Sequence, residues 1–381
     1  MTGSRGSRWL VAGIALGLAG MLATGWIFGW ERFWGNWLLW TLFLLTIGLG
    51  CLFIVGLEHV IGAKWSVPVR RIPERLSGLI LLMSPALLLA LLSLRQLYPW
   101  THPESLENPL IAGKSAWLNV PFFVIRVLIC IALWLISYRI LVAGSYKQDW
   151  NRDVRFSVRA RRMGPVYMVI FGITITILAF DWISGLEPTW YSDIFGVYLF
   201  AGAFLASLAA TSLLLIHQLA RRRLPGIRPD HIYNLGGFMF AFTVFWGYIG
   251  FAQFLLMWYA NLPEEVFWYK ERLEGLWVPI LSVIIAFHFV LPFLLLMPRD
   301  AKSNMRRLAW VSMFMLMAHW LDLYWMIMPA IDKKPQFGWM ELSFAFFFVC
   351  LTLLWIRRAL AQGADMPVGD PFFKEGLEFH L

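Results

Sequence analysis

The chain has 381 residues, of which 60% are hydrophobic and only 14% are charged, and its formal net charge is +9. This composition is unusual for a soluble domain and typical of a polytopic membrane protein. A positive balance also suits a nucleic-acid-binding protein. In a membrane chain, however, Lys and Arg gather in the cytoplasmic connections, so we expect no nucleic acid partner.

Ten mostly apolar runs are long enough to cross a bilayer as α-helices, which need about 20 residues each. They predict an all-α polytopic membrane protein. Its transmembrane helices are expected at roughly 9–30, 38–62, 76–98, 119–145, 164–184, 194–220, 235–260, 276–298, 308–329 and 338–359. The first run follows Arg5 and Arg8, as in a signal peptide, but its apolar stretch is longer than a signal sequence has. We therefore expect an uncleaved first helix.

Lys and Arg gather in every second connection between these runs, chiefly at 64–75, 147–162, 221–228 and 299–307. Basic residues near the ends of spans stay in the cytoplasm. The alternation therefore predicts that both termini are cytoplasmic, which requires an even number of spans.

Three segments outside the runs carry further predictions. Residues 179–198, AFDWISGLEPTWYSDIFGVY, form an acidic turn at the outer end of the fifth span, with Asp181, Glu187 and Asp193. Residues 261–275 are predicted to form a short amphipathic helix at the membrane surface, with its Phe and Trp toward lipid. The polar tail from 362 to 381 is rich in Gly and Pro, so we expect it to pack along a partner.

A faint internal repeat suggests how the spans are grouped. The second run ends in GLEHVIGAKWSVPVRR and the sixth in LLLIHQLARRRLPG, each with a histidine before a basic loop that contains proline. The repeat predicts two four-helix bundles, formed by spans 2–5 and 6–9, with flanking helices. The predicted divisions are 1–37, 38–184, 185–329 and 330–381.

Ionisable residues inside spans cost about 2.5–3.5 kcal/mol each at the helix centre and mark ion or proton pathways by default. The candidates for a proton relay are Glu58, His59, Asp181, His288, His319 and Asp322, and weaker candidates are Arg126, His217 and Glu341. His319 and Asp322 are three positions apart and share one helix face. There the carboxylate can orient the imidazole and hold its proton.

Each candidate also has a structural interpretation. Glu58, His59 and His217 lie near inner span ends, where they can reach the interface. Asp181 lies near an outer end, where a carboxylate can be hydrated, and Arg126 is expected to pair with an acid from another helix. Pro292 removes the amide that would bond to the carbonyl of His288, which predicts a kink there.

No motif for a prosthetic group is present. Cys51, Cys130 and Cys350 lie inside apolar runs, and the sequence has no CxxC, CxxCH or Cys/His cluster. We therefore expect no cofactor and no metal in this chain. Motifs for nucleotide binding, zinc proteolysis and serine nucleophiles are also missing, so the sequence gives no support for an enzyme that acts alone.

The sequence resembles the NrfD/PsrC-type membrane subunits, and among them the second NrfD-like subunit, ActF type, of bacterial alternative complex III. The resemblance is carried, in this order, by FDWISGLEPTWYSDIFGVYLFAG, NLGGFMFAFTVFWGYIGFAQFLLMWYANLPEE, HFVLPFLLLMPRDAK and LDLYWMIMP. It extends from about the second predicted span to the tenth.

The resemblance implies a subunit of a quinol:electron acceptor oxidoreductase in the bacterial inner membrane, which oxidises menaquinol and delivers electrons to a cytochrome c or a terminal oxidase. It implies that menaquinone, iron–sulfur clusters and c-type haems belong to partner subunits. These partners are a paralogous NrfD-like quinol-binding subunit, an iron–sulfur subunit, multihaem cytochrome c subunits and a terminal oxidase, with phospholipid around the spans. This subunit would then lack cofactors and contribute to proton translocation or conformational coupling.

Two alternatives stay open. In the first, this chain itself binds quinone or menaquinol. In the second, it is a secondary transporter that works alone, which favours broken helices at matching positions of two repeats. The prolines at 85, 121 and 292 do not fall at matching positions. If the relay interpretation holds, the acidic turn is the outer mouth of a proton path or a contact for a periplasmic partner.

Overall fold

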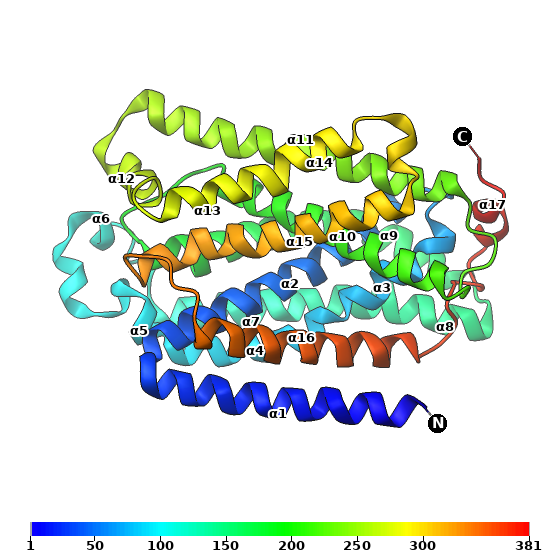
Figure 1. Cartoon of the computed structure of the whole chain (residues 1–381), viewed down its shortest axis with the longest axis horizontal. Helices are drawn as coiled ribbons and strands as arrows, with labels where there is room; N and C mark the ends of the chain where they lie inside the picture. Colours follow the sequence, from blue (N-terminus) through cyan, green and yellow to red (C-terminus); the bar gives the residue numbers. More distant parts are fainter. Residues whose placement is uncertain (1, 381) are drawn as a thin grey trace.

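The computed structural model describes residues 2–380, with side chains from residue 6 onward, and the described residues are 81% helical with no strand (Figure 1). Ten segments are long and apolar enough to span a membrane. The predicted all-α polytopic architecture is therefore confirmed. The spans are α1 (Thr2–Phe28), α2 (Trp30–Ile61), α3 to α5 (Arg71–Ser77, Leu79–Ala90 and Leu94–Leu97), α7 and α8 (Val120–Tyr138 and Gly144–Asn151), α9 (Arg155–Leu178), α10 (Phe195–Ala220), α11 (Pro229–Ala260), α13 and α14 (Trp277–Ile284 and Leu291–Leu296), α15 (Met305–Ile327) and α16 (Trp339–Leu360).

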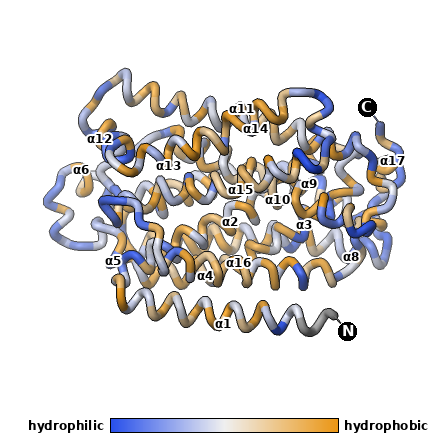
Figure 2. Tube along the Cα trace, viewed as in Figure 1, coloured by the Kyte–Doolittle hydropathy of each residue, from blue (hydrophilic) through white to orange (hydrophobic). Residues whose placement is uncertain are grey.

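Both termini lie at one end of the bundle (Figure 1), together with the connections at 62–70, 152–154, 221–228 and 297–304. We call it the basic end, since Lys and Arg concentrate there. The short helix α17 (Phe373–Leu377) also lies at this end, whereas α6 (Pro109–Ala112) and α12 (Pro263–Arg272) lie at the opposite end. Hydrophilic residues gather at the two ends and hydrophobic residues fill the middle (Figure 2), as expected for a membrane bundle.

Three spans contain a π-helical segment within the described residues. These segments are η5 (Arg139–Ala143), which joins α7 to α8, η6 (Ala179–Ile183), which continues α9, and η8 (Ile285–Val290), which joins α13 to α14. Pro292 follows η8 and lacks the amide that a regular helix would use, so the predicted kink takes the form of a π-segment. Such segments occur often at functional sites.

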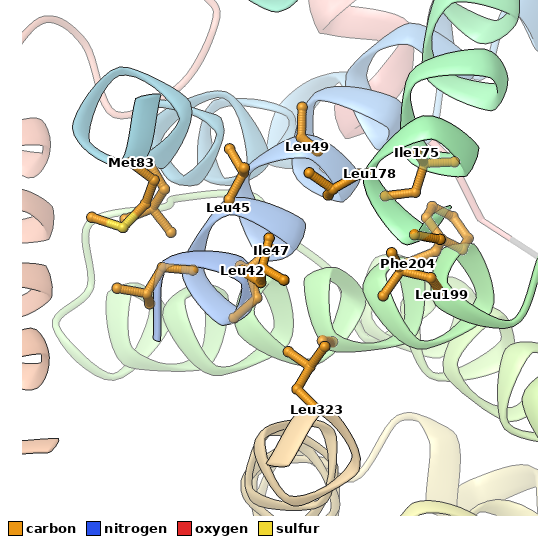
Figure 3. Packing of buried hydrophobic residues seen from close by; sticks show 14 of the residues in the cluster. Leu42, Leu45, Ile47, Leu49, Met83, Ile175, Leu178, Leu199, Phe204 and Leu323 are labelled. Carbon is orange, nitrogen blue, oxygen red and sulfur yellow. The ribbon is translucent and has the colours of Figure 1, made fainter. Parts of the chain in front are cut away.

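The helices α2 and α10 form the centre of the bundle. In their most apolar windows, 89% and 78% of the residues are buried, whereas the corresponding share in α1 and α11 is 28%. Apolar side chains of α2, α4, α9, α10 and α15 interlock around this centre (Figure 3). Small residues let the two helices approach: the hydroxyl oxygen of Ser207 on α10 lies 2.9 Å from the carbonyl oxygen of Ile47 on α2 and 2.7 Å from that of Ala203 on its own helix.

The remaining helices pack around these two. The helices α3, α4 and α9 contact α2, whereas α11 and α15 contact α10, and α2 and α10 contact each other. The division of the chain into two four-helix bundles with boundaries at 37, 184 and 329 stays a prediction, since helix packing alone does not define separate units.

The predicted connection at residues 31–37 is wrong. Only Gly29 separates α1 from α2, and its φ of 103° lies in the region that favours glycine. The polar residues that suggested a loop are inside α2, where Arg32 and Asn36 are buried against the carboxylate of Glu341 on α16. Arg32 and Asn36 can lie inside a helix because Glu341 accepts their hydrogen bonds.

The first span packs against the last through a face of glycines. A Cβ atom added to Gly17 would lie 2.8 Å from the Cα atom of Phe347, and one added to Gly20 would lie 2.8 Å from the hydroxyl of Ser343. Small residues at such spacing allow close helix contact in membranes, where packing rather than hydrophobicity holds helices together.

The short helix predicted at 261–275 exists as α12, but its predicted orientation is wrong. Trp268 is buried rather than exposed to lipid, and its ring stacks on that of Trp190 at 4.4 Å. The guanidinium of Arg272 lies 3.9 Å from the centre of the Trp268 ring. The aromatic face of α12 therefore covers the acidic turn instead of anchoring the chain in lipid.

The C-terminal tail packs on its own chain, and the contact with a partner that its composition suggests stays a prediction. Asp370 forms an ion pair with Arg70 at 2.6 Å, Asp365 accepts from Arg75 at 3.0 Å, and Glu375 pairs with Lys64. The polar composition of the tail indicates that it cannot form a hydrophobic core by itself. Its acids nevertheless complement the arginines of the segment that joins α2 to α4.

A cysteine introduced at Gly13 tests the contact between α1 and α16. A Cβ atom at Gly13 would lie 3.6 Å from the Cβ atom of the native Cys350, within the range of about 3.5–4.5 Å found in disulfides. We expect Gly13→Cys to form an intrachain disulfide with Cys350 on mild oxidation. Counting free thiols by maleimide labelling of the denatured protein measures the reaction.

Ala15→Cys is the matched control, because residue 15 is exposed on the other face of the same helix. In this variant, the introduced cysteine and Cys350 should both stay free thiols. Equal disulfide yields in the two variants would contradict the helix pairing.

Candidate functional site

Most buried acids in the bundle are neutralised by arginine. Asp181, in η6, forms a two-pronged ion pair with Arg126 of α7, with distances of 2.8 Å from Nε and 2.9 Å from Nη2. The indole of Trp117 donates to the same carboxylate over 2.9 Å, and the guanidinium lies 4.1 Å from the centre of that indole ring. The expectation that Arg126 pairs with an acid of another helix is confirmed, and both groups have their hydrogen bonds satisfied.

Two further pairs follow the same rule at the opposite end. Glu187 of the acidic turn accepts from Arg272 of α12 at 2.5 Å. Glu341 at the start of α16 accepts from Arg32 at 2.6 Å and from the backbone amide of Gly338 at 2.8 Å. These contacts tie loops and helix ends together. The geometry of Asp181, Arg126 and Glu341 is therefore that of structural ion pairs.

Asp322 on α15 differs from these acids. It is buried, and in the described part of the chain no Lys or Arg forms an ion pair with it. Its Oδ1 accepts a hydrogen bond of 2.6 Å from the phenol of Tyr198 on α10. An ionisable group kept in a membrane interior without a counter-charge marks a functional site by default.

His319 lies one turn before Asp322 and is fully buried. Its Nε2 is 3.1 Å from the hydroxyl of Thr46 on α2, and this hydroxyl also lies 3.0 Å from the carbonyl of Phe43. A threonine has one hydroxyl proton. Since the carbonyl can only accept, Nε2–H donates to Thr46, and this assigns the lone pair of His319 to Nδ1.

The Nδ1 atom of His319 has no hydrogen-bond partner in the described protein. It faces Gly202 of α10, where an added Cβ atom would lie 3.2 Å away. Glycine at this position leaves the nitrogen uncovered. The site therefore contains a basic nitrogen able to accept a proton near the middle of the bundle.

His288 is also fully buried, and neither of its ring nitrogens has a hydrogen-bond partner in the described protein. It lies in η8, and its ring centre is 4.2 Å from that of Trp246 on α11 and 6.1 Å from that of His319. Leaving buried polar atoms unsatisfied costs about 1–3 kcal/mol. Two unpartnered nitrogens on one buried ring, next to His319, make His288 a candidate functional residue.

We refer to Thr46, Tyr198, His288, His319 and Asp322 as the central polar cluster. It joins the central helices α2 and α10 to α15 and to the irregular span that contains η8. The cluster combines two imidazoles, a carboxyl group and a phenol, all of which can gain or lose a proton. The arrangement can hold and pass a proton, and it lacks the arginine that fixes the charge of the other buried acids.

Sequence reasoning found His288, His319 and Asp322 but missed Tyr198, Thr46 and Gly202. Tyrosine and threonine are ordinary residues in membrane helices, so neither stands out in an apolar run. The only signal was position, because Tyr198 and Gly202 lie in the string that continues the acidic turn. Their contacts depend on how α10 packs against α15.

Glu58 and His59 lie elsewhere, at the basic end of α2. Together with Arg70, Arg161 and Asp370 they line a cavity of about 70 Å³, which we call the tail pocket. Neither Oε2 of Glu58 nor Nε2 of His59 has a hydrogen-bond partner in the described protein. The structure does not bring these two residues to the central polar cluster.

Asp370 holds the tail at this pocket. Burial acts to raise the pKa of its carboxyl group, but the adjacent Arg70 outweighs burial, so the pKa lies below its usual value. Asp370 therefore stays charged and paired with Arg70 over the physiological pH range.

His217 is exposed at the basic end of α10 and lines a larger cavity. It belongs to neither of the two sites above. Among the described residues, no group of three or more His, Cys, Asp or Glu is placed to hold a metal ion.

Comparison with known proteins finds no family model that matches the sequence and no significantly similar curated protein. The fold and the side-chain geometry are therefore the basis for a functional proposal, together with the resemblance of the four strings.

Asp181→Asn should destabilise the protein strongly, because it leaves the buried guanidinium of Arg126 without its counter-charge. Breaking one side of a buried ion pair costs about 3–5 kcal/mol. The thermal unfolding midpoint of the purified protein in detergent measures the effect. Asp193→Asn is the control, since Asp193 is exposed on the same turn and should leave the midpoint unchanged.

A double variant, Arg126→Met with Asp181→Leu, removes both charges and should recover most of the lost stability. If the double variant were as unstable as Asp181→Asn, the interpretation of the pair as purely structural would fail.

The attachment of the tail should depend on pH with a defined sign. Because the folded pKa of Asp370 is lowered, its contribution is complete above the unfolded pKa and disappears as the pH falls through the folded value. We expect the tail to loosen below about pH 4. Fluorescence anisotropy of a dye on Glu378→Cys measures tail mobility.

In Asp370→Asn the dye should already be mobile at pH 7, with a much smaller step in the acid range. Lys374→Gln serves as the matched control, since no ion pair joins Lys374 to another described residue. A mobile tail at neutral pH in the unmodified chain would contradict the role of Asp370.

Proposed function

We propose that this protein is a membrane subunit, without redox cofactors of its own, of a quinol:electron acceptor oxidoreductase of the alternative complex III type. In that complex it contributes to proton translocation or to conformational coupling. The observation that supports this most directly is the central polar cluster, where Asp322 lacks a counter-charge and His288 and His319 have unsatisfied nitrogens.

The resemblance and the geometry converge on the same residues. The four strings that resemble the NrfD-like subunits contain Tyr198, Gly202, Trp246, His288 and Asp322, all of which lie in or against the cluster. The residues that carry the resemblance therefore include most of those that form or cover the cluster.

In this proposal, the chain's own residues move and hold protons. Nδ1 of His319 accepts a proton, while Nε2–H stays bonded to Thr46. The carboxyl group of Asp322 exchanges a proton with the cluster, and the phenol of Tyr198 stabilises its charged form by donating to it. A small shift of α15 against α10 changes the Tyr198 contact, so a conformational change in a partner subunit can alter where the proton resides.

The proposed partners carry the electrons. They are a paralogous NrfD-like quinol-binding subunit, an iron–sulfur subunit and multihaem cytochrome c subunits, with menaquinone, clusters and haems bound there. The proposed location is the bacterial inner membrane with both termini in the cytoplasm. The basic end supports this orientation, because Lys and Arg mark the cytoplasmic side.

A second candidate function, quinone binding on this chain, is favoured by one cavity. At the opposite end, a cavity of about 510 Å³ is lined by Trp117, Phe180, Trp190 and Tyr191 together with Lys114. Aromatic walls with a few polar groups, here Lys114, Ser184 and the phenol of Tyr191, are typical of small-molecule sites. Photo-crosslinking with a quinone analogue distinguishes the candidates: labelling of this lining favours quinone binding, and labelling confined to a partner subunit rejects it.

Replacement of Asp322 tests the main proposal. In the purified, reconstituted complex, Asp322→Asn should leave menaquinol oxidation in detergent intact, because no electron carrier is touched. Proton release or membrane-potential formation in vesicles should fall by about tenfold or more, since the carboxyl group no longer exchanges a proton. Parallel assays of oxidation and membrane potential measure the two effects.

Glu341→Gln alters a buried acid outside the cluster and Asp193→Asn an exposed one. Neither should uncouple the two activities. Full coupling in an assembled Asp322→Asn complex would remove this residue from the proton path, and purification of the chain as a lone, solute-transporting protein would favour the transporter alternative.

A further inference from the structure

A cavity of about 1010 Å³ opens near the basic end and extends inward to Phe43, whose ring centre lies 5.9 Å from that of His319. Seven helices provide its apolar walls, with Leu10 from α1, Phe43 from α2, Leu76 from α3, Leu79 from α4, Leu214 from α10, Leu316 from α15 and Ile356 from α16. Its volume is at the upper limit of about 300–1,000 Å³ for small-molecule sites. The cavity lies between the outer helices α1 and α16 and the centre of the bundle, where nothing else in the described chain fills it.

The mouth of this cavity is strongly basic. Arg221, Arg223 and Arg357 line it, together with His217 and Gln218. Arg221 forms no ion pair with another described residue, and the acid nearest to Arg223 is Asp365 at a loose 3.9 Å. At the mouth, Arg221 therefore has no acidic partner among the described residues and Arg223 has only this distant one, in contrast to the arginines of the buried ion pairs.

A buried polar group also faces the cavity. The side chain of Gln218 is almost fully buried, and its Oε1 has no hydrogen-bond partner in the described protein. The hydroxyl of Thr352, deeper along α16, is likewise unpartnered. The site thus has an apolar interior, an anion-binding mouth and an acceptor positioned beside it.

We propose that this cavity binds one anionic glycerophospholipid from the adjacent leaflet. Its phosphate lies between Arg221 and Arg223, a headgroup hydroxyl donates to Gln218, and an acyl chain extends toward Phe43 and Leu316. Basic pockets between membrane helices recognise the headgroups of anionic lipids in this way. The bound lipid fixes α1 and α16 to the rest of the bundle.

An uncharged amphiphile fits the observations less well. A quinone or a zwitterionic lipid satisfies the apolar walls but brings no net negative charge to Arg221 and Arg223. The inference concerns the basic end alone and does not depend on the proposed role of the central polar cluster.

Native mass spectrometry of the full chain, released from nanodiscs that contain phosphatidylglycerol and phosphatidylcholine, tests the proposal. We expect one retained phosphatidylglycerol per chain. Arg221→Gln combined with Arg223→Gln should lower the retained fraction by about tenfold or more, because each arginine near a lipid surface attracts anionic headgroups. Ala210→Phe, at a small residue of the cavity wall, should also expel the lipid by filling its chain site.

Arg222→Gln combined with Arg306→Gln is the matched control, as it removes the same charge from exposed positions outside the cavity. Retention should not change. Equal retention of both lipids, equal loss in the control variant, or retention in Ala210→Phe would overturn the proposal, as would recovery of a quinone in place of the phospholipid.

Discussion

A buried charge in a membrane bundle needs a partner, and this requirement organises the structure. At the opposite end, arginines neutralise Asp181, Glu187 and Glu341, which fixes α7 to α9, the acidic turn to α12, and α2 to α16. At the basic end, Arg70 and Arg75 hold the tail through Asp370 and Asp365. Between these two ends, the packed centre contains Asp322, a buried acid that forms no ion pair with Lys or Arg among the described residues.

The bonding of Asp322 differs from that of the other buried acids described above. Beside acids that are paired with arginine, a carboxyl group whose hydrogen bond within the described chain comes from a phenol stands out as a different kind of site. Both nitrogens of His288 and Nδ1 of His319 likewise have no hydrogen-bond partner among the described residues.

The sequence was sufficient to predict the spans, because a run of about 20 apolar residues has few alternatives to a membrane helix. It was not sufficient to predict what polar residues between runs do. Arg32 suggested a loop and is inside α2, and Trp268 suggested a lipid anchor and is stacked on Trp190. Each error arose because the partner lies far along the chain.

The candidate site shows the same limit. The spacing of His319 and Asp322 places them on one face of a helix from sequence alone. The phenol of Tyr198, the hydroxyl of Thr46 and the bare backbone of Gly202 come from two other helices, and only the packing of α2, α10 and α15 brings them there. Helical periodicity predicts which residues share a face but not which face another helix presents.

The contact between α1 and α16 has a consequence for biogenesis. During synthesis, the first span enters the membrane long before its partner has been made, and its glycine face then has no helix to lie against. Eight further spans, those between α1 and α16, must be inserted before α16. The helix α1 is therefore among the last to reach its final position, and its glycine face stays without its partner helix until α16 has been inserted.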